Sequence, residues 1–441
     1  MTIVDPTTLR ARFAVRLSDL YGSEVPAYTT LLEVSQEVNR RVLERDGARA
    51  ERLGSIERVT AERHGAIRVG SPAELAQVTR VFGALGMSPT GFYDLRDAHP
   101  RPIPVISTAF RPTGRDELAK NPFRVFTSLL VPEDRRFFDA DLELRIKEFI
   151  SRRELFVPEL LELADHATAD GGLPPDAADR FLDLAIASFA LSDDPVDRTW
   201  YDELEQISGV AADIAGVGST HINHLTPRVL DIDELYAAMQ ARGIEMIDKI
   251  QGPPRWNGPD VLLRQTSFRA LAEPRRYREA DGSITDGTMR VRFGEVEARG
   301  IALTPSGRDL YEKAMADPDH WSELIPGSER AFHTQGLAYF TYRPAPLRPS
   351  QAPAPGLTPD ELLTGGWLIA QPIVYEDFLP RSAAGIFASN LSGAGGADTG
   401  QGGAERDISW LAEQIGRPVN VPEELYAAES KASMAQALEQ L

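Results

Sequence analysis

The feature that most constrains the fold is an internal repeat, because two stretches 160 residues apart carry the same kinds of residue in the same order. Each stretch, residues 64–75 and residues 224–235, has a histidine, an arginine four positions later, a helix-capping residue at position +7, and Glu-Leu at +10 and +11. Caps and Glu-Leu pairs are common alone, but the joint match at one offset is not. A duplicated unit with one histidine per copy predicts a metal site built between two halves.

The residues around each histidine predict a strand, a turn and a helix. In the first copy, residues 62–69 suit a strand that ends at Gly70, and Ser71, Pro72 and Glu74 then provide an N-cap, a proline at the first helical position and a capping-box acid. We expect the helix to end near residue 85 and strands to follow at 104–110 and 123–131. The second copy predicts a strand at 221–226, a helix at 231–242, and strands at 261–268 and 288–297.

The segment between the two copies has helical patterns instead, and residues 6–47 before the first copy read as two helices. The expected organisation therefore has five segments. They are an N-terminal helical segment (1–50), a first β-α-β unit with one metal histidine (51–135), a helical insertion (136–215), a second β-α-β unit with the sheet that completes the metal site (216–390), and a Gly-rich loop with C-terminal helices (391–441).

Composition narrows the range of partners and ligands. The chain has 441 residues and a formal net charge of −19, which argues against nucleic acid and anionic membrane surfaces as partners. It has no cysteine, so metal ligands must be His, Asp or Glu. No run of about 18 apolar residues is present and the first residues lack the features of a signal peptide, so we expect a cytoplasmic protein.

Of the seven histidines, the repeat selects two as ligands. His99, His166 and His320 are most simply structural or exposed, because of their turn or helix-end positions. His221 and His224 are three residues apart and face opposite sides of the expected strand, so only one can point into a shared site. The repeat favours His224 as the partner of His64.

A third ligand is expected from a carboxylate on a nearby strand. Glu295 and Glu297 lie on the same face of one predicted strand, so the periodicity does not choose between them. Two imidazoles and one carboxylate form the facial triad that suits Fe(II), although Mn²⁺, Co²⁺, Ni²⁺ or Zn²⁺ could occupy the same ligands.

Arg68 is the expected anchor for an anionic substrate. It lies four residues after His64, hence on the same face of the strand, and a guanidinium can bind a carboxylate in a two-point fork. The alternative is a surface ion pair with a neighbour such as Glu62.

Several blocks of the sequence closely resemble the 2-oxoadipate dioxygenase/decarboxylase family, and the resemblance spans nearly the whole chain. The blocks are residues 62–70 (ERHGAIRVG), 221–233 (HINHLTPRVLDID), 263–268 (LRQTSF), 293–297 (FGEVE), 375–380 (YEDFLP) and 382–387 (SAAGIF). The resemblance implies an α+β fold of the vicinal-oxygen-chelate type, with duplicated β-α-β-β units forming a curved central sheet and with large helical insertions.

The resemblance also implies a mononuclear non-haem Fe(2+) enzyme that converts 2-oxoadipate and O₂ to 2-hydroxyglutarate and CO₂, a step of bacterial D-lysine catabolism. It implies iron ligands His64, His224 and Glu295, with Glu297 as the fallback, and catalytic roles for His64, Arg68 and His224. The implied substrate contacts are His64, Arg68, His224, Arg381 and Ser382. The family usually has an apolar residue where Arg381 stands, so the range of 2-oxo diacids that the protein accepts stays open. The sequence does not predict the oligomeric state.

Two other functions fit the same residues. A vicinal-oxygen-chelate lyase or isomerase would use the His/His/Glu site with a redox-inert metal and without O₂, and anaerobic turnover would reveal it. A non-catalytic diacid-binding protein built on a decayed enzyme would be indicated by failure to bind any divalent metal.

Overall fold

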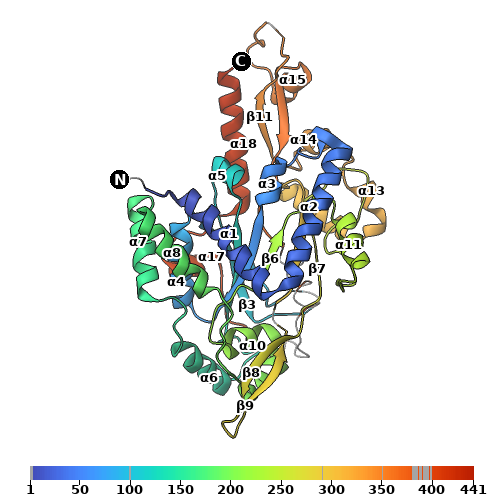
Figure 1. The fold of residues 1–441 in the computed structure, drawn as a ribbon. Coiled ribbons are helices and arrows are strands. Elements are labelled where there is room, and N and C mark those ends of the chain that lie inside the picture. The colour runs from blue at the N-terminus through green and yellow to red at the C-terminus, as the bar shows by residue number, and fades with distance from the viewer. Residues whose placement is uncertain are drawn as a thin grey trace.

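At the centre of the computed structural model is a five-stranded sheet with the order β2-β3-β4-β1-β6 (Figure 1). The structure describes residues 3–98, 101–290, 292–349, 351–379, 386, 390, 397 and 400–441. The strands of the sheet are β1 (Arg63–Val69), β2 (Ser88–Asp94), β3 (Val105–Arg111), β4 (Arg124–Leu130) and β6 (His224–Pro227). The first repeat supplies four of these strands and the second repeat supplies β6.

The second repeat continues beyond β6 with two more strands. β7 (Leu263–Ser267) and β10 (Glu295–Arg299) pair in antiparallel fashion. β10 adjoins β6 in parallel, because Arg228 and Glu297 form a bridge and the N–H of Val229 donates to the carbonyl of Glu297 at 2.8 Å. Strand β10 therefore lies beside β6 as β4 lies in parallel beside β1.

Strands β1 and β6 pair in antiparallel fashion, and their register is symmetric with respect to the two repeats. His64 lies opposite Thr226, and Ala66 lies opposite His224. The repeat offset of 160 residues converts the first pair into the second, so a local two-fold axis relates the strands near Gly65. Both histidines therefore point to the same side of the sheet.

The equivalent helix of each repeat begins where the sequence predicts it. In α4 (Pro72–Ala84) the Ser71 side chain accepts from the N–H of Glu74 at 3.2 Å. In α11 (Ile232–Ala241) the Asp231 side chain accepts from the N–H of Glu234 at 3.0 Å. These side-chain caps satisfy N–H groups that have no partner inside the helix. The duplicated strand-turn-helix unit is thereby confirmed.

The two faces of the sheet pack against different cores. Ile67 and Val69 belong to a large apolar cluster that includes residues of α1 (Pro6–Glu24), α2 (Pro26–Asp46) and α4. Ala66, on the opposite face, belongs to a second cluster with Phe126. Because side chains alternate along a strand, His64 and Arg68 share the face of Ala66.

The remaining elements surround this sheet, and β11, β12, α15 and α18 extend from it at the top of Figure 1. Their bounds are η1 Gly47–Arg49, α3 Ile56–Ala61, α5 Arg115–Lys120, α6 Ala140–Ser151, α7 Pro158–Asp170, α8 Pro175–Ser188, β5 Val196–Asp197, α9 Arg198–Ile207, α10 Gly209–Gly216, β8 Glu273–Arg278, β9 Ile284–Met289, α12 Pro305–Ala316, η2 Pro318–His320, α13 Trp321–Leu324, α14 Glu329–Thr334, β11 Phe340–Pro344, α15 Pro359–Thr364, β12 Leu368–Pro372, α17 Ile408–Ile415 and α18 Pro422–Glu439.

The five-segment organisation stays a prediction. The segment 136–215 contains α6 to α10 and the two-residue strand β5. The Gly-rich part of 391–441 falls largely outside the described residues. Among the described residues, no helix is both long enough and apolar enough to cross a bilayer.

One strand is not predicted from the sequence, and two predicted strands have other bounds. The sequence does not predict β2, because Pro89 and Gly91 interrupt its pattern, yet it forms the edge of the sheet, where a proline is tolerated. The strand expected at 221–226 begins only at 224, so His221 lies in the preceding loop. The run expected at 288–297 is two strands, β9 and β10, and the residues described between them are not in a strand.

The break before β10 coincides with a close approach at Gly294. A Cβ atom on Gly294 would lie 1.8 Å from Cε1 of Phe268. We expect Gly294→Ala to lower the free energy of unfolding by about 1–3 kcal/mol, because overpacking forces one of the two groups to move. Urea denaturation measures the change. Gly218→Ala is the control, since nothing lies within 4 Å of its Cβ position. Equal losses in the two variants would contradict the tight packing at Gly294.

Candidate metal centre

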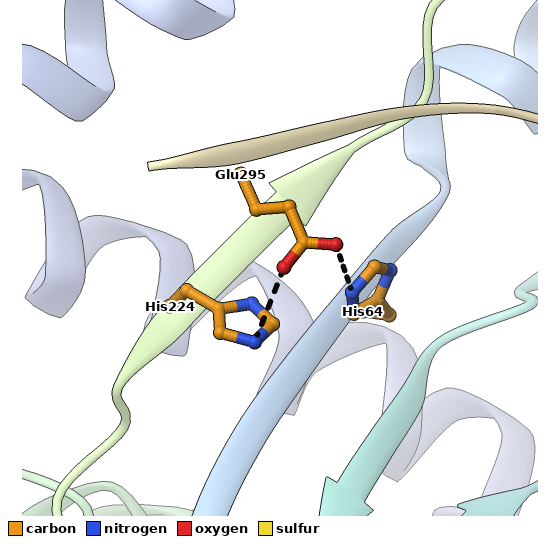
Figure 2. Close-up of side chains that lie close together, drawn as sticks. All are labelled: His64, His224 and Glu295. Carbon is orange, nitrogen blue, oxygen red and sulfur yellow. Dashed lines mark ion pairs between the residues drawn. The ribbon is translucent and has the colours of Figure 1, made fainter. Parts of the chain in front are cut away.

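Three side chains from three adjacent strands converge on one point, as Figure 2 shows. His64 comes from β1, His224 begins β6, and Glu295 begins β10. The Nε2 atom of His64 lies 3.6 Å from Oε1 of Glu295, and Nε2 of His224 lies 3.5 Å from Oε2. The imidazole rings are nearly perpendicular, at 89°, with centroids 5.3 Å apart. One carboxylate thus faces both imidazoles.

This donor set fits a divalent metal ion. One ligand atom from each of the three residues lies within 4.8 Å of the others. Two neighbouring ligands that are each about 2.1 Å from one ion are roughly 3 Å apart, so a small movement of the side chains suffices to bring them into coordination. Imidazole and carboxylate ligands suit first-row divalent metals. The three side chains lie together, as the sequence predicts. Their role as metal ligands stays a prediction.

The protonation of the two imidazoles differs. Burial, followed by repulsion from His64 and Arg68, holds the pKa of His224 well below its usual range. Burial also lowers the pKa of His64, but Glu297 and Glu295 more than offset this and raise it overall. His224 is therefore neutral at pH 7, which is the form that binds a metal.

The structure distinguishes the two glutamates that the sequence left as alternatives. Glu295 is buried, which raises its pKa, and it accepts a hydrogen bond from the side-chain amide of Gln265. Glu297 instead accepts two hydrogen bonds from Arg299, at 2.6 and 2.9 Å, and lies 3.5 Å from Arg124. Burial alone would raise the pKa of Glu297, but Arg299 and other neighbouring cations lower it to about 2. The carboxylate of Glu297 is thus already paired with a cation, whereas that of Glu295 faces the imidazoles.

Aromatic side chains and one tyrosine hydroxyl surround the centre. Phe293 stacks on His224, with ring centroids 5.2 Å apart, and Phe378 meets His64 edge-on at 5.0 Å. The hydroxyl of Tyr21 lies 2.8 Å from the carbonyl of Phe293 and 3.1 Å from that of Asn223. Through Tyr21, helix α1 thereby contacts the backbone one residue before His224 and two residues before Glu295.

Arg68 lies on the same face of β1 as His64 and is buried, so the alternative of a surface ion pair is wrong. Its Nη1 donates to the carboxylate of Asp213, which comes from α10 in the helical insertion. His221 also meets Asp213, with Nε2 at 3.2 Å. Sequence reasoning missed Asp213, since nothing in a helix of small apolar residues marks one aspartate as the partner of a strand residue 145 positions away.

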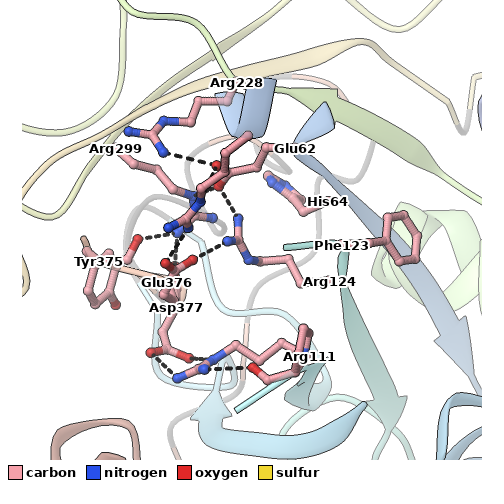
Figure 3. A network of polar contacts seen from close by, with 12 residues as sticks. Glu62, His64, Arg111, Phe123, Arg124, Arg228, Arg299, Tyr375, Glu376 and Asp377 are labelled. Atoms are coloured by element: carbon pink, nitrogen blue, oxygen red, sulfur yellow. Dashed lines mark hydrogen bonds and ion pairs between the residues drawn. The ribbon is translucent and has the colours of Figure 1, made fainter. Parts of the chain in front are cut away.

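A second group of ion pairs, also missed from the sequence, lies beside His64 (Figure 3). Glu62 accepts from Arg124 at 2.7 Å and from Arg228 at 3.0 Å. Glu376 accepts from Arg124 and from Arg58. The two repeat arginines therefore differ: Arg228 belongs to this ion-pair network, whereas Arg68 pairs with Asp213.

The other candidate substrate contacts cannot be placed. Arg381 and Ser382 lie outside the described residues, as does His99. Their expected contacts stay predictions.

Comparison with known proteins identifies relatives over nearly the full length. Residues 13–390 match the family described as 2-oxoadipate dioxygenase/decarboxylase. A protein of that name from Mycobacterium tuberculosis is 58% identical over 423 residues, which cover 95% of this chain and 96% of that protein. The crystal structure of the hydroxyglutarate synthase from Pseudomonas putida, in complex with 2-oxoadipate, is 36% identical, with a TM-score of 0.83 over 100% of this chain and 99% of that chain.

A more distant structure is alike in fold alone. A protein from Ralstonia eutropha described as belonging to the glyoxalase superfamily has a TM-score of 0.50 and 20% identity, over 67% of this chain and 84% of that chain. The α+β fold of the vicinal-oxygen-chelate type expected from the sequence is confirmed.

We expect a divalent ion such as Mn²⁺ or Co²⁺ to stabilise the protein, because the ion binds the folded centre and not the unfolded chain. At 100 times the dissociation constant the gain is about 2.7 kcal/mol. Thermal unfolding with and without metal measures it. His224→Ala should lose the shift, whereas His320→Ala, a change at an exposed histidine 3 residues from its partner Asp317, should keep it. A shift that survives His224→Ala would place the binding site elsewhere.

Proposed function

The chain belongs to the 2-oxoadipate dioxygenase/decarboxylase family, and on that premise we propose that it is an Fe²⁺-dependent enzyme that converts 2-oxoadipate and O₂ to 2-hydroxyglutarate and CO₂. The observation that carries the proposal is the convergence of His64, His224 and Glu295 from three neighbouring strands. The atoms balance, since C1 leaves as CO₂ with its own two oxygens and both atoms of O₂ enter 2-hydroxyglutarate, one in the new carboxylate and one in the hydroxyl group. The partners are a small-molecule 2-oxo diacid and O₂.

The metal is the first part of the proposal. His64, His224 and Glu295 would hold Fe²⁺, and the ion would supply the redox chemistry that O₂ requires. The imidazole of His224 is neutral because burial and the nearby His64 and Arg68 lower its pKa. It therefore binds the ion without first losing a proton. Other first-row metals fit the same donors, so metal analysis of anaerobically purified protein is the direct check.

Substrate binding is the second part. Arg68 binds the carboxylate of the diacid that is distal to the keto group, and this orients the chain of the substrate toward the histidines. Asp213 pairs with Arg68 in the absence of substrate and fixes the side chain where it is buried. Arg381 and Ser382 are the further contacts that we propose. Phe293 and Phe378 pack against the two imidazoles and exclude water from this side of the centre.

The location and the pathway follow from the same proposal. An intracellular 2-oxo diacid as substrate fits a cytoplasmic enzyme and a role in lysine catabolism, and both stay predictions.

The proposed reaction predicts equal amounts of O₂ consumed and CO₂ released from 2-oxoadipate. An oxygen electrode and ¹⁴C release from the labelled C1 carboxylate measure the two quantities in one reaction mixture. No turnover is expected under strict anaerobiosis. Anaerobic turnover would overturn the proposal and would favour a lyase or isomerase that uses the same ligands.

We expect loss of Arg68 to raise the KM for 2-oxoadipate about 10-fold to 150-fold, which corresponds to about 1.5–3 kcal/mol for a charge-assisted pair. Arg68→Ala alone leaves Asp213 buried without its cation, so the double variant Arg68→Ala/Asp213→Ala is measured beside it. The KM for 2-oxohexanoate, which lacks the distal carboxylate, should change much less. Equal changes for the two substrates would contradict the anchoring role.

A further inference from the structure

The two candidate imidazole ligands are supported in different ways at Nδ1, the ring nitrogen that faces away from Glu295. Nδ1 of His224 lies 3.0 Å from the hydroxyl of Thr226, two residues further along the same strand. The equivalent residue of the first repeat is Ala66, which has no hydroxyl. His64 therefore has no partner of this kind on its own strand.

The partner of His64 comes from the second repeat instead. Nδ1 of His64 lies 3.0 Å from Oε2 of Glu297 on β10. The contact is short, but it is not aligned with the ring N–H as an ideal hydrogen bond would be. In the metal-bound protein, the Nδ1–H of His64 would donate to this carboxylate.

Glu297 is held rigidly where it meets His64. Arg299, on the same strand, donates to both of its oxygens. The other side of that guanidinium donates to the backbone carbonyls of Tyr375 and Asp377, at 2.8 and 3.0 Å, as Figure 3 shows for the surrounding network. The pair Glu297–Arg299 is fully buried, so water does not compete for these contacts.

The same strand thus presents two carboxylates with different tasks. Side chains two apart on a strand share a face, which places Glu295 at Nε2 of both histidines and Glu297 at Nδ1 of His64. A histidine that binds a metal through one nitrogen commonly donates from the other to a carboxylate, which fixes the ring orientation and the tautomer.

We propose that Glu297, held by Arg299, is a positioning residue that orients His64 and keeps its proton on Nδ1, so that Nε2 faces the metal. This inference rests on the proposed function, because it takes His64 as a metal ligand. It assigns Glu297 a role other than that of the fallback ligand.

The test uses full-length protein loaded with Co²⁺, and its readouts do not require turnover. The Co²⁺ dissociation constant, from titration calorimetry, should rise about 10- to 100-fold in Glu297→Gln. Glu376→Gln is the matched control, because Glu376 is a buried carboxylate of the same network that contacts Arg58 and Arg124. Its dissociation constant should stay within about twofold of that of the parent protein. Glu295→Gln, by contrast, should abolish binding.

A spectroscopic signature separates positioning from a general loss of structure. In Co²⁺-loaded protein, each ligating imidazole gives one strongly shifted, solvent-exchangeable Nδ1–H proton signal. Glu297→Gln should move only the signal of His64, and Thr226→Val should move only that of His224. If Glu297→Gln does not fold, the double variant Glu297→Gln/Arg299→Gln removes both charges of the pair and is measured in its place.

The outcomes are distinct. If the parent protein binds no Co²⁺, the proposed function itself fails. If the parent binds Co²⁺ and Glu297→Gln binds it as tightly with both proton signals unmoved, the positioning role is overturned. If Glu297→Gln abolishes binding while Glu295→Gln retains it, Glu297 is the ligand and the proposal is wrong. If Glu376→Gln weakens Co²⁺ binding as much as Glu297→Gln does, the loss of one negative charge from the network explains the effect, and the positioning role is overturned.

Discussion

The pairing of β1 with β6 is the interaction on which the centre depends. It joins the two repeats, and its register places Ala66 opposite His224 so that both histidines emerge on one side of the sheet. A slip of one residue would turn every side chain of one strand to the opposite face, and the two imidazoles would no longer meet. Gly65 lies near the two-fold axis, and a Cβ there would come within 2.7 Å of Cδ1 of Ile222. A larger residue at position 65 would therefore require the Ile222 side chain to move.

Charge is balanced around the centre although the chain is strongly acidic. The ion-pair network beside His64, taken together with Glu295, contains five arginines and five carboxylates among the described residues. These are Arg58, Arg111, Arg124, Arg228 and Arg299, with Glu62, Glu295, Glu297, Glu376 and Asp377. The pair of Arg68 with Asp213 adds no net charge. A divalent ion together with a dianionic substrate preserves this balance, whereas either alone leaves buried charge uncompensated. The net charge of −19 thus arises from residues outside this network.

The sequence predicts what is local or repeated, and it fails for contacts between distant segments. The repeat identifies His64 and His224, and the caps of α4 and α11 follow from short-range residue patterns. The partner of Arg68 is 145 residues away, and the segment that supplies Glu376 to Arg124 is 252 residues away. No periodicity encodes such pairs. The choice between Glu295 and Glu297 was open for the same reason, since both share one face of β10 and only their partners on other segments distinguish them.

The second repeat supplies a carboxylate that the first does not. Arg68 pairs with Ser128 across β1 and β4, and Arg228 pairs with Glu297 across β6 and β10. Ser128 on β4 therefore corresponds to Glu297 on β10, and two residues earlier on these strands Phe126 corresponds to Glu295. A fully symmetric duplication would surround the metal with two imidazoles and two carboxylates. Replacement of one carboxylate by Phe126, which packs against Phe378 at 5.0 Å, removes a ligand from one side and lines that side with aromatic rings. Departure from symmetry at this position thus leaves the candidate metal centre with two imidazoles and one carboxylate.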